Sequence, residues 1–216
     1  MVFPVTKRQV FYSFHYAKDC RRVQQIRNMN IFEGTKELSP NKWEEIKRSG
    51  DANVRKWIDD NLKYRSCTIV LIGEKTATRK WVKYEIKRSW ELGKGVVGVN
   101  IHRLKDLDGS KSRKGGNPFK DIVVNGVELS KVVPIYNPQD TQECSAYNDI
   151  KNNISQWVEN GVSVRQTYPG CTQYQANVCS HSVKNTNGSN ALAEILLAGA
   201  LSFIGLLACS KLKIRR

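Results

Sequence analysis

Residues 66–101 constrain the fold most strongly, because two buried strands and a helix follow one another there. Cys67–Ile72 is a short apolar run rich in β-branched residues and followed by Gly73, as expected for a parallel strand covered on both faces. Val96–Ile101 has the same character. The segment between them repeats apolar residues at helical spacing, at Val82, Ile86 and Trp90. Two such strands joined by a helix predict a right-handed crossover in a parallel sheet.

The rest of the chain supports an α/β fold with three layers and a mainly parallel sheet. Further strands are expected at Val10–Phe14 and Val132–Tyr136, and a hairpin at Ile122–Leu129, since Asn-Gly suits a tight turn. We expect helices at Cys20–Asn30, Trp43–Arg48, Asp51–Leu62 and Asp149–Asn160, with Asp51 and Thr78 as helix caps and Gly161 as a helix end. The polar residues His15–Asp19 are expected to form a loop.

Several chemistry-bearing side chains are predicted to meet at the carboxyl edge of this sheet, where open α/β sheets bind ligands. Trp81 and Glu85 lie four residues apart on one helical face, just beyond the loop that follows the second strand. The first strand ends at the same edge with Ser13, Phe14, His15 and Tyr16. Two plainer roles stay open, a solvated helix carboxylate for Glu85 and core packing for Trp81.

The charge of the chain favours an anionic partner. The net charge is +15, of which the residues up to Arg165 carry +11 and the tail +4. Nucleic acid is disfavoured because the basic residues are scattered and no nucleic-acid motif is present. No G-x-G-x-x-G follows a predicted strand and opens a helix, and the sequence has no Walker loop, so a Rossmann or P-loop nucleotide site is disfavoured. The six cysteines have no zinc-like spacing, so no metal is expected.

The carboxyl-terminal part of the chain differs in composition from the body. Residues 1–165 are predicted to form the α/β domain, and residues 166–190 a polar linker. Residues 191–210 are almost wholly apolar and are expected to form a helix that anchors the protein in a membrane, with the body in the cytoplasm. The alternative is a helix buried in a homo-oligomer, and the oligomeric state is left open.

Four segments of the chain are considered together: VFYSFHYAKDCRRVQQIRN, SCTIVLIGEKTATRKWVKYEIKRS, GKGVVGVNIH and GGNPF. They resemble the TIR-like family that includes the sensor subunit of Thoeris antiphage defence. The segment RKWVKYEI also resembles the W-x-x-x-E element of TIR domains, in which the Glu cleaves NAD. The resemblance implies a flavodoxin-like TIR fold with Glu85 as the catalytic residue. It also implies a phage trigger, and an ADP-ribose-derived signal that a downstream effector protein senses. Whether that signal is hydrolysed, cyclised or conjugated ADP-ribose is left open.

The chemistry of NAD cleavage fits these residues. Nicotinamide leaves as a neutral molecule from a cationic substrate, so the step needs no general acid, and its transition state resembles an oxocarbenium ion. A carboxylate beside the ribose stabilises that charge, which is the role expected of Glu85. Ser13, Phe14, His15, Tyr16 and Trp81 are expected to contact the substrate, and Gly73 to allow close backbone approach. NAD is a substrate here, so no cofactor is expected.

Two other functions remain open from the sequence. The first is a non-catalytic TIR-like module that only self-assembles or recruits partners. The second is a nucleoside deoxyribosyltransferase-like enzyme that uses the same carboxylate on another N-glycosidic bond. Release of nicotinamide from NAD would distinguish the three hypotheses.

Overall fold

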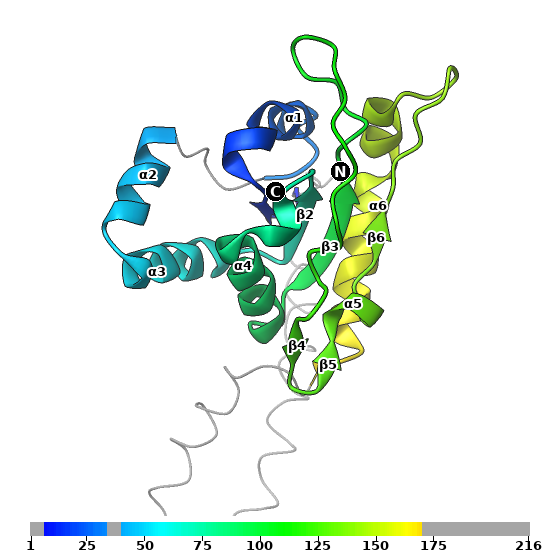
Figure 1. Cartoon of the computed structure of the whole chain (residues 1–216). Coiled ribbons are helices and arrows are strands. Elements are labelled where there is room, and N and C mark those ends of the chain that lie inside the picture. The colour runs from blue at the N-terminus through cyan, green and yellow to red at the C-terminus, as the bar shows by residue number, and fades with distance from the viewer. Residues whose placement is uncertain (1–6, 34–39, 170–216) are drawn as a thin grey trace, which may run out of the picture. The chain divides into compact units, whose positions relative to one another are not determined.

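The computed structural model describes residues 7–33 and 40–169. Its main sheet has the strand order β1-β2-β3-β6, and all neighbouring strands are parallel (Figure 1). These strands are β1 (Val10–Ser13), β2 (Cys67–Ile72), β3 (Gly95–Asn100) and β6 (Ile135–Tyr136). The predicted α/β fold with a mainly parallel sheet is therefore confirmed.

The chain also pairs with β1 on the side away from β2. Gln9 and Glu33 form an isolated parallel bridge, in which the amide of Val10 donates to the carbonyl of Glu33 at 2.9 Å. The amide of Glu33 in turn donates to the carbonyl of Arg8 at 3.1 Å. The connection after β1 thus runs to one side of this strand, whereas β2 and β3 lie on the other. Such a reversal of strand order opens a crevice at the carboxyl ends of the central strands, as in flavodoxin-like folds.

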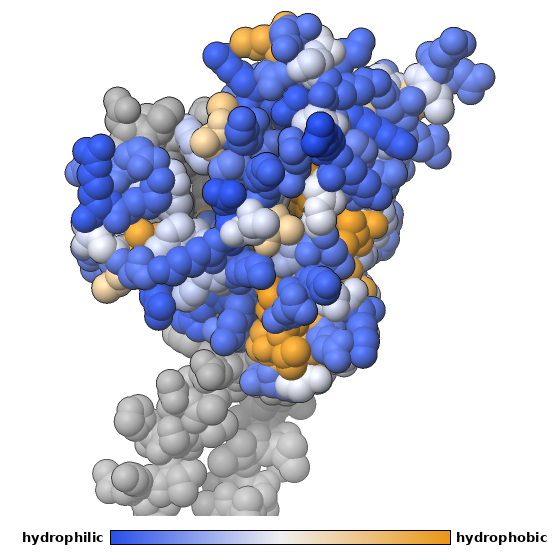
Figure 2. Space-filling view, in the orientation of Figure 1, coloured by the Kyte–Doolittle hydropathy of each residue, from blue (hydrophilic) through white to orange (hydrophobic). Residues whose placement is uncertain are grey.

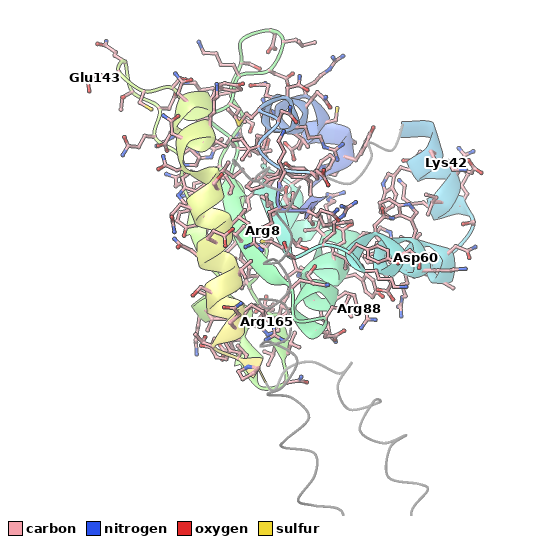
Figure 3. The ribbon with its side chains drawn as sticks, turned by 180° about the vertical axis from the view of Figure 1, so that it is seen from behind. Arg8, Lys42, Asp60, Arg88, Glu143 and Arg165 are labelled. Carbon is pink, nitrogen blue, oxygen red and sulfur yellow. The ribbon has the colours of Figure 1, made fainter. Side chains whose placement is uncertain are left out.

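Helices cover both faces of the sheet. The helices α1 (Tyr16–Asn28) and α6 (Ala146–Gln166) bury their apolar residues with Tyr12, Ile69 and Val99 on one face. The helices α3 (Asp51–Leu62) and α4 (Lys80–Glu91) cover the other face, against residues such as Phe11, Val70 and Ile72. The short helix α2 (Pro40–Arg48) packs beside α3. Figure 3, seen from behind, shows α6 in front of the sheet, with α2 and α3 to one side.

Both predicted helix caps are wrong. The hydroxyl of Thr78 donates to the carbonyl of Lys75 within the 3-10 turn η1 (Thr76–Thr78), and α4 begins after Arg79 without a side-chain cap. Asp51 is the first residue of α3, and Gly50 precedes it at a φ of 98°. In both places the backbone turn, and no side-chain oxygen, sets the start of the helix.

Two helix boundaries also differ from the prediction. Helix α1 begins at Tyr16, so the loop expected at His15–Asp19 is wrong; Asp19 is polar but only 1% exposed. Helix α6 continues through Gly161 to Gln166. A Cβ atom at Gly161 would lie 2.9 Å from the carbonyl oxygen of Val96, so this glycine allows the helix to approach β3 closely.

The predicted hairpin is present as β4 (Val123–Val124) and β5 (Val127–Glu128). Its turn residues Asn125 and Gly126 have φ angles of 49° and 82°, as a two-residue hairpin turn requires. The helix α5 (Leu129–Val132) follows, which shortens the strand expected at Val132–Tyr136 to β6. Figure 2 shows apolar side chains gathered over this lower part of the domain, where Val123 and Ile135 are exposed.

The prediction of a membrane-attached protein is corrected here. Across residues 7–33 and 40–169, no helix is long and apolar enough to cross a membrane. The segment 191–210, where the apolar anchor helix was expected, lies outside the described residues, as does most of the linker 166–190. We therefore no longer expect the protein to be attached to a membrane. The boundaries of the domain and the linker stay a prediction.

Candidate active site

A cavity of about 450 Å³ opens at the carboxyl end of β1, a volume typical of sites that bind small molecules. The end of β1, the start of α1, the helices α2 and α3, and the start of α4 contribute to its walls. Its lining comprises Phe11, Tyr12, Phe14, His15, Tyr16, Ala17, Arg27, Trp43, Glu44, Lys47, Trp57, Thr78, Arg79, Lys80, Trp81, Val82 and Glu85. It therefore lies at the crevice that the strand order creates.

Glu85 is the one carboxylate in this cavity that belongs to the protein core. It is 7% exposed on the second turn of α4, and the hydroxyl of Ser13 donates a 2.5 Å hydrogen bond to its Oε2 atom. Burial raises the pKa of Glu85 to about 8, against the lowering effect of the Ser13 hydrogen bond. In the described part of the chain, Glu85 forms no ion pair. A buried carboxyl group without a cationic partner is suited to receive positive charge from a ligand.

Aromatic rings form much of the cavity wall. Phe14 and Tyr16 stack with their ring centroids 5.7 Å apart at the turn after β1. On the α2 and α3 side, the rings of Trp43 and Trp57 lie 5.6 Å apart. Trp81 lines the cavity one turn before Glu85. Flat apolar walls of this kind suit the rings of a nucleotide-like ligand.

Positive charge surrounds the mouth of the cavity. Burial lowers the pKa of His15, and the nearby charges of Arg79, Lys18 and Lys47 lower it further. The imidazole of His15 is therefore neutral at neutral pH. Its Nδ1 atom is buried and has no hydrogen-bond partner in the described structure. Neutral His15 can thus form a hydrogen bond with a ligand. The surrounding cations favour a ligand that is an anion.

The structure brings most of the predicted site residues together. Those that line the cavity are Phe14, His15, Tyr16, Trp81 and Glu85, and Ser13 lies behind them, bonded to Glu85. Gly73 does not line the cavity. The space above its Cα atom is filled by the carboxylate of Asp19, so a Cβ there would collide with that group. Gly73 thus permits the packing of α1 against the end of β2.

Sequence reasoning missed the cavity residues that come from α2, α3 and the last turn of α1. They are Arg27, Trp43, Lys47 and Trp57, with Tyr12 of β1. Trp43 and Trp57 fall in predicted helices, and they are the sequence signal that could have indicated these cavity residues. Large aromatic rings on short polar helices call for a packing or binding partner. Their convergence on β1 depends on long-range packing.

A metal site is not evident in the described ranges. No three side chains of the His, Cys, Asp or Glu type converge there as ligands.

Comparison with known proteins bears on the same part of the chain. Residues 11–106 match the family described as the TIR-like domain of the Thoeris protein ThsB. The chain is also 36% identical over 117 residues to a Bacillus cereus (strain MSX-D12) protein named "Putative cyclic ADP-D-ribose synthase ThsB1". That similarity covers 52% of this chain and 61% of the relative, so the chain spans less than two thirds of the relative's length. The family match includes every predicted site residue from Ser13 to Glu85.

Proposed function

We propose that this protein is a TIR-like enzyme of the Thoeris ThsB type, a family that its residues 11–106 match, and that it cleaves NAD in antiphage defence. The proposed reaction breaks the bond between nicotinamide and ribose and yields an ADP-ribose-derived signal. The printed name of the Bacillus cereus relative, "Putative cyclic ADP-D-ribose synthase ThsB1", supports a cyclic product. A downstream effector protein would sense the signal, and phage infection would trigger its synthesis.

The observation that carries this proposal is the environment of Glu85. Its carboxyl group is buried at the cavity floor, is bonded by Ser13 and lacks a cationic partner among the described residues. Burial disfavours the charged carboxylate, which raises the pKa to about 8. The positively charged nicotinamide ribosyl group of NAD would offset that cost and lower the pKa again. The site would therefore become ionised when its cationic substrate enters.

The bond-breaking step then needs only this charge and the geometry of the cavity. As the glycosidic C–N bond breaks, its electron pair moves to the pyridinium nitrogen and nicotinamide leaves as a neutral molecule. The positive charge shifts to the ribose, where the carboxylate of Glu85 would stabilise it and accept hydrogen bonds from the ribose hydroxyls. Capture of the ribose by water gives ADP-ribose, whereas capture by a nucleophile within the same molecule gives a cyclic product. One proton is released in either case.

The neighbouring residues would position the substrate. Trp81 lies one turn from Glu85 and can stack on the nicotinamide ring. Phe14 and Tyr16 provide a second aromatic wall, and neutral His15 offers a hydrogen-bonding group at the mouth. Ser13 holds the carboxylate of Glu85 in one orientation.

Incubation of the purified protein with NAD tests the proposal. Free nicotinamide should accumulate, and an ADP-ribose-derived product should accumulate in equal amount. The assay is run with and without lysate from phage-infected cells, because the enzyme is expected to need a trigger. A scaffold would release no nicotinamide under either condition, and a deoxyribosyltransferase-like enzyme would instead release bases from deoxynucleosides.

A further inference from the structure

Four cationic side chains line the cavity, and they differ in what they already bind. Lys47 forms a 2.5 Å ion pair with Glu44, and Lys80 pairs with Asp51. Arg79 donates to the carbonyl of Lys75 at 3.2 Å and to the hydroxyl of Thr78 at 3.1 Å. Each of these three cations therefore has an acceptor within the protein.

Arg27 differs from the other three. It lies in the last turn of α1 and forms no ion pair or hydrogen bond through its guanidinium group to any residue in the described ranges. The Nε atom of Arg27 is buried and lacks an acceptor. The side chain to which it belongs lines the cavity. A buried donor without a partner is unfavourable, and in a native protein it calls for an explanation, such as a bound water, ion or ligand.

Two aromatic rings fix the position of this guanidinium group. Its central carbon lies 5.4 Å from the ring centroid of Tyr12 and 5.9 Å from that of Phe14. These contacts hold the charge through the ring faces and leave its N–H groups available. A planar guanidinium with available donors matches the oxygen atoms of a phosphate group.

We propose that Arg27 binds the diphosphate of the substrate and thereby sets the position of the ribose over Glu85. This inference rests on the proposed function for the identity of the substrate. Arg27 is on α1 and Glu85 on α4, and both line the same cavity, so a dinucleotide bound across it can meet both residues. The aromatic walls would then hold its rings, and Arg27 would hold its charge.

Binding measurements on the full chain test Arg27 separately from catalysis. Calorimetry with ADP should show binding to the wild type and a loss of about 10- to 100-fold in affinity in Arg27→Met, because a charge-assisted contact is removed. Adenosine, which lacks phosphate, should bind both proteins equally. Arg21→Met is the matched control, since it removes the same charge from an exposed position of α1 that does not line the cavity, and it should change ADP affinity by less than about threefold.

Two further readouts distinguish binding from a structural role. Arg27→Lys should give an intermediate ADP affinity, because lysine keeps the charge and loses the flat fork of donors. With nicotinamide riboside, which carries no phosphate, Arg27→Met should release nicotinamide at the wild-type rate, while its KM for NAD rises.

Several outcomes would overturn the assignment. They are an absence of ADP binding to the wild type, an equal loss in Arg21→Met, and a parallel fall in turnover of NAD and nicotinamide riboside. Should Arg27→Met not fold, wild-type ADP affinity in a folded Arg27→Lys protein would also count against it. A wild-type protein that binds ADP through Arg27 but releases no nicotinamide would refute the proposed function and leave this inference standing.

Discussion

The pKa of Glu85 should govern how the proposed activity depends on pH. Burial raises this pKa to about 8 in the free protein. If the ionised carboxylate is the active form, kcat/KM for nicotinamide release rises with pH and levels off above about 8. Bound NAD adds a positive charge beside the carboxylate, so the midpoint of the kcat profile should lie at lower pH.

Ser13 offers a direct test of that assignment. Its hydrogen bond lowers the pKa of Glu85, so Ser13→Ala should move the kcat/KM midpoint to higher pH. Ser155→Ala, an exposed position on α6, should leave the midpoint unchanged. A midpoint near the ordinary glutamate value in the wild type, or an unmoved midpoint in Ser13→Ala, would contradict the role of Glu85.

The same buried carboxyl group should reduce the stability of the fold. The pKa of Glu85 is higher in the folded state than in the unfolded state. The fold is therefore most stable below the unfolded value near 4.5, where the group is neutral in both states, and loses that stability as the pH rises to about 8. Glu85→Gln keeps the shape without the charge. Its free energy of unfolding should exceed that of the wild type by an amount that grows by roughly 1.4 kcal/mol per pH unit across this window, then stays level.

Denaturant unfolding at several pH values measures this difference. A difference between the two proteins that does not change between pH 5 and pH 8 would show that Glu85 is solvated in the folded protein. The wild-type protein would then lack the buried charge on which the proposed mechanism depends.

At the scale of the elements, the contact between α6 and β3 depends on Gly161. A Cβ there would lie 2.9 Å from the carbonyl oxygen of Val96 and 3.3 Å from its carbonyl carbon, which belong to the backbone of a buried strand. Gly161→Ala should therefore destabilise the protein by about 1–3 kcal/mol, although alanine favours helices. Urea unfolding measures the change, with Ser155→Ala as a helix control expected to be neutral or slightly stabilising. A stabilised Gly161→Ala protein would show that α6 lies farther from the sheet.

The sequence predicted the central elements well because their signals are local. The strand at Cys67–Ile72 has the predicted bounds, and Val82, Ile86 and Trp90 face the core as expected. The misjudged boundaries depend on tertiary contacts. Asp19 appears in the sequence as a loop residue, yet Arg22 lies 3.9 Å from its carboxylate inside the protein. Gly161 appears as a helix end, yet it serves close packing.

At the scale of the molecule, the candidate site is assembled from segments far apart in the chain. The part predicted from sequence comes from the end of β1 and from the helix α4 that follows β2, and their position at one sheet edge follows from topology alone. The part that was missed, Arg27, Trp43 and Trp57, is placed by helix packing on β1, for which no short-range pattern exists. Thus the end of the cavity around Glu85 could be predicted from the sequence, whereas the end around Arg27, Trp43 and Trp57 could not.

One measurement tests the central claim, that the buried carboxylate at this edge cleaves NAD. Nicotinamide release is measured for the wild type, Glu85→Gln and Glu91→Gln in the presence of lysate from phage-infected cells. Glu91 is on the same helix but pairs with Arg88 and Lys87 and does not line the cavity, so Glu91→Gln is the matched control. The account predicts release by the wild type and Glu91→Gln, and at least about a hundredfold loss in Glu85→Gln. Equal release by all three proteins, or release by none of them, would contradict it.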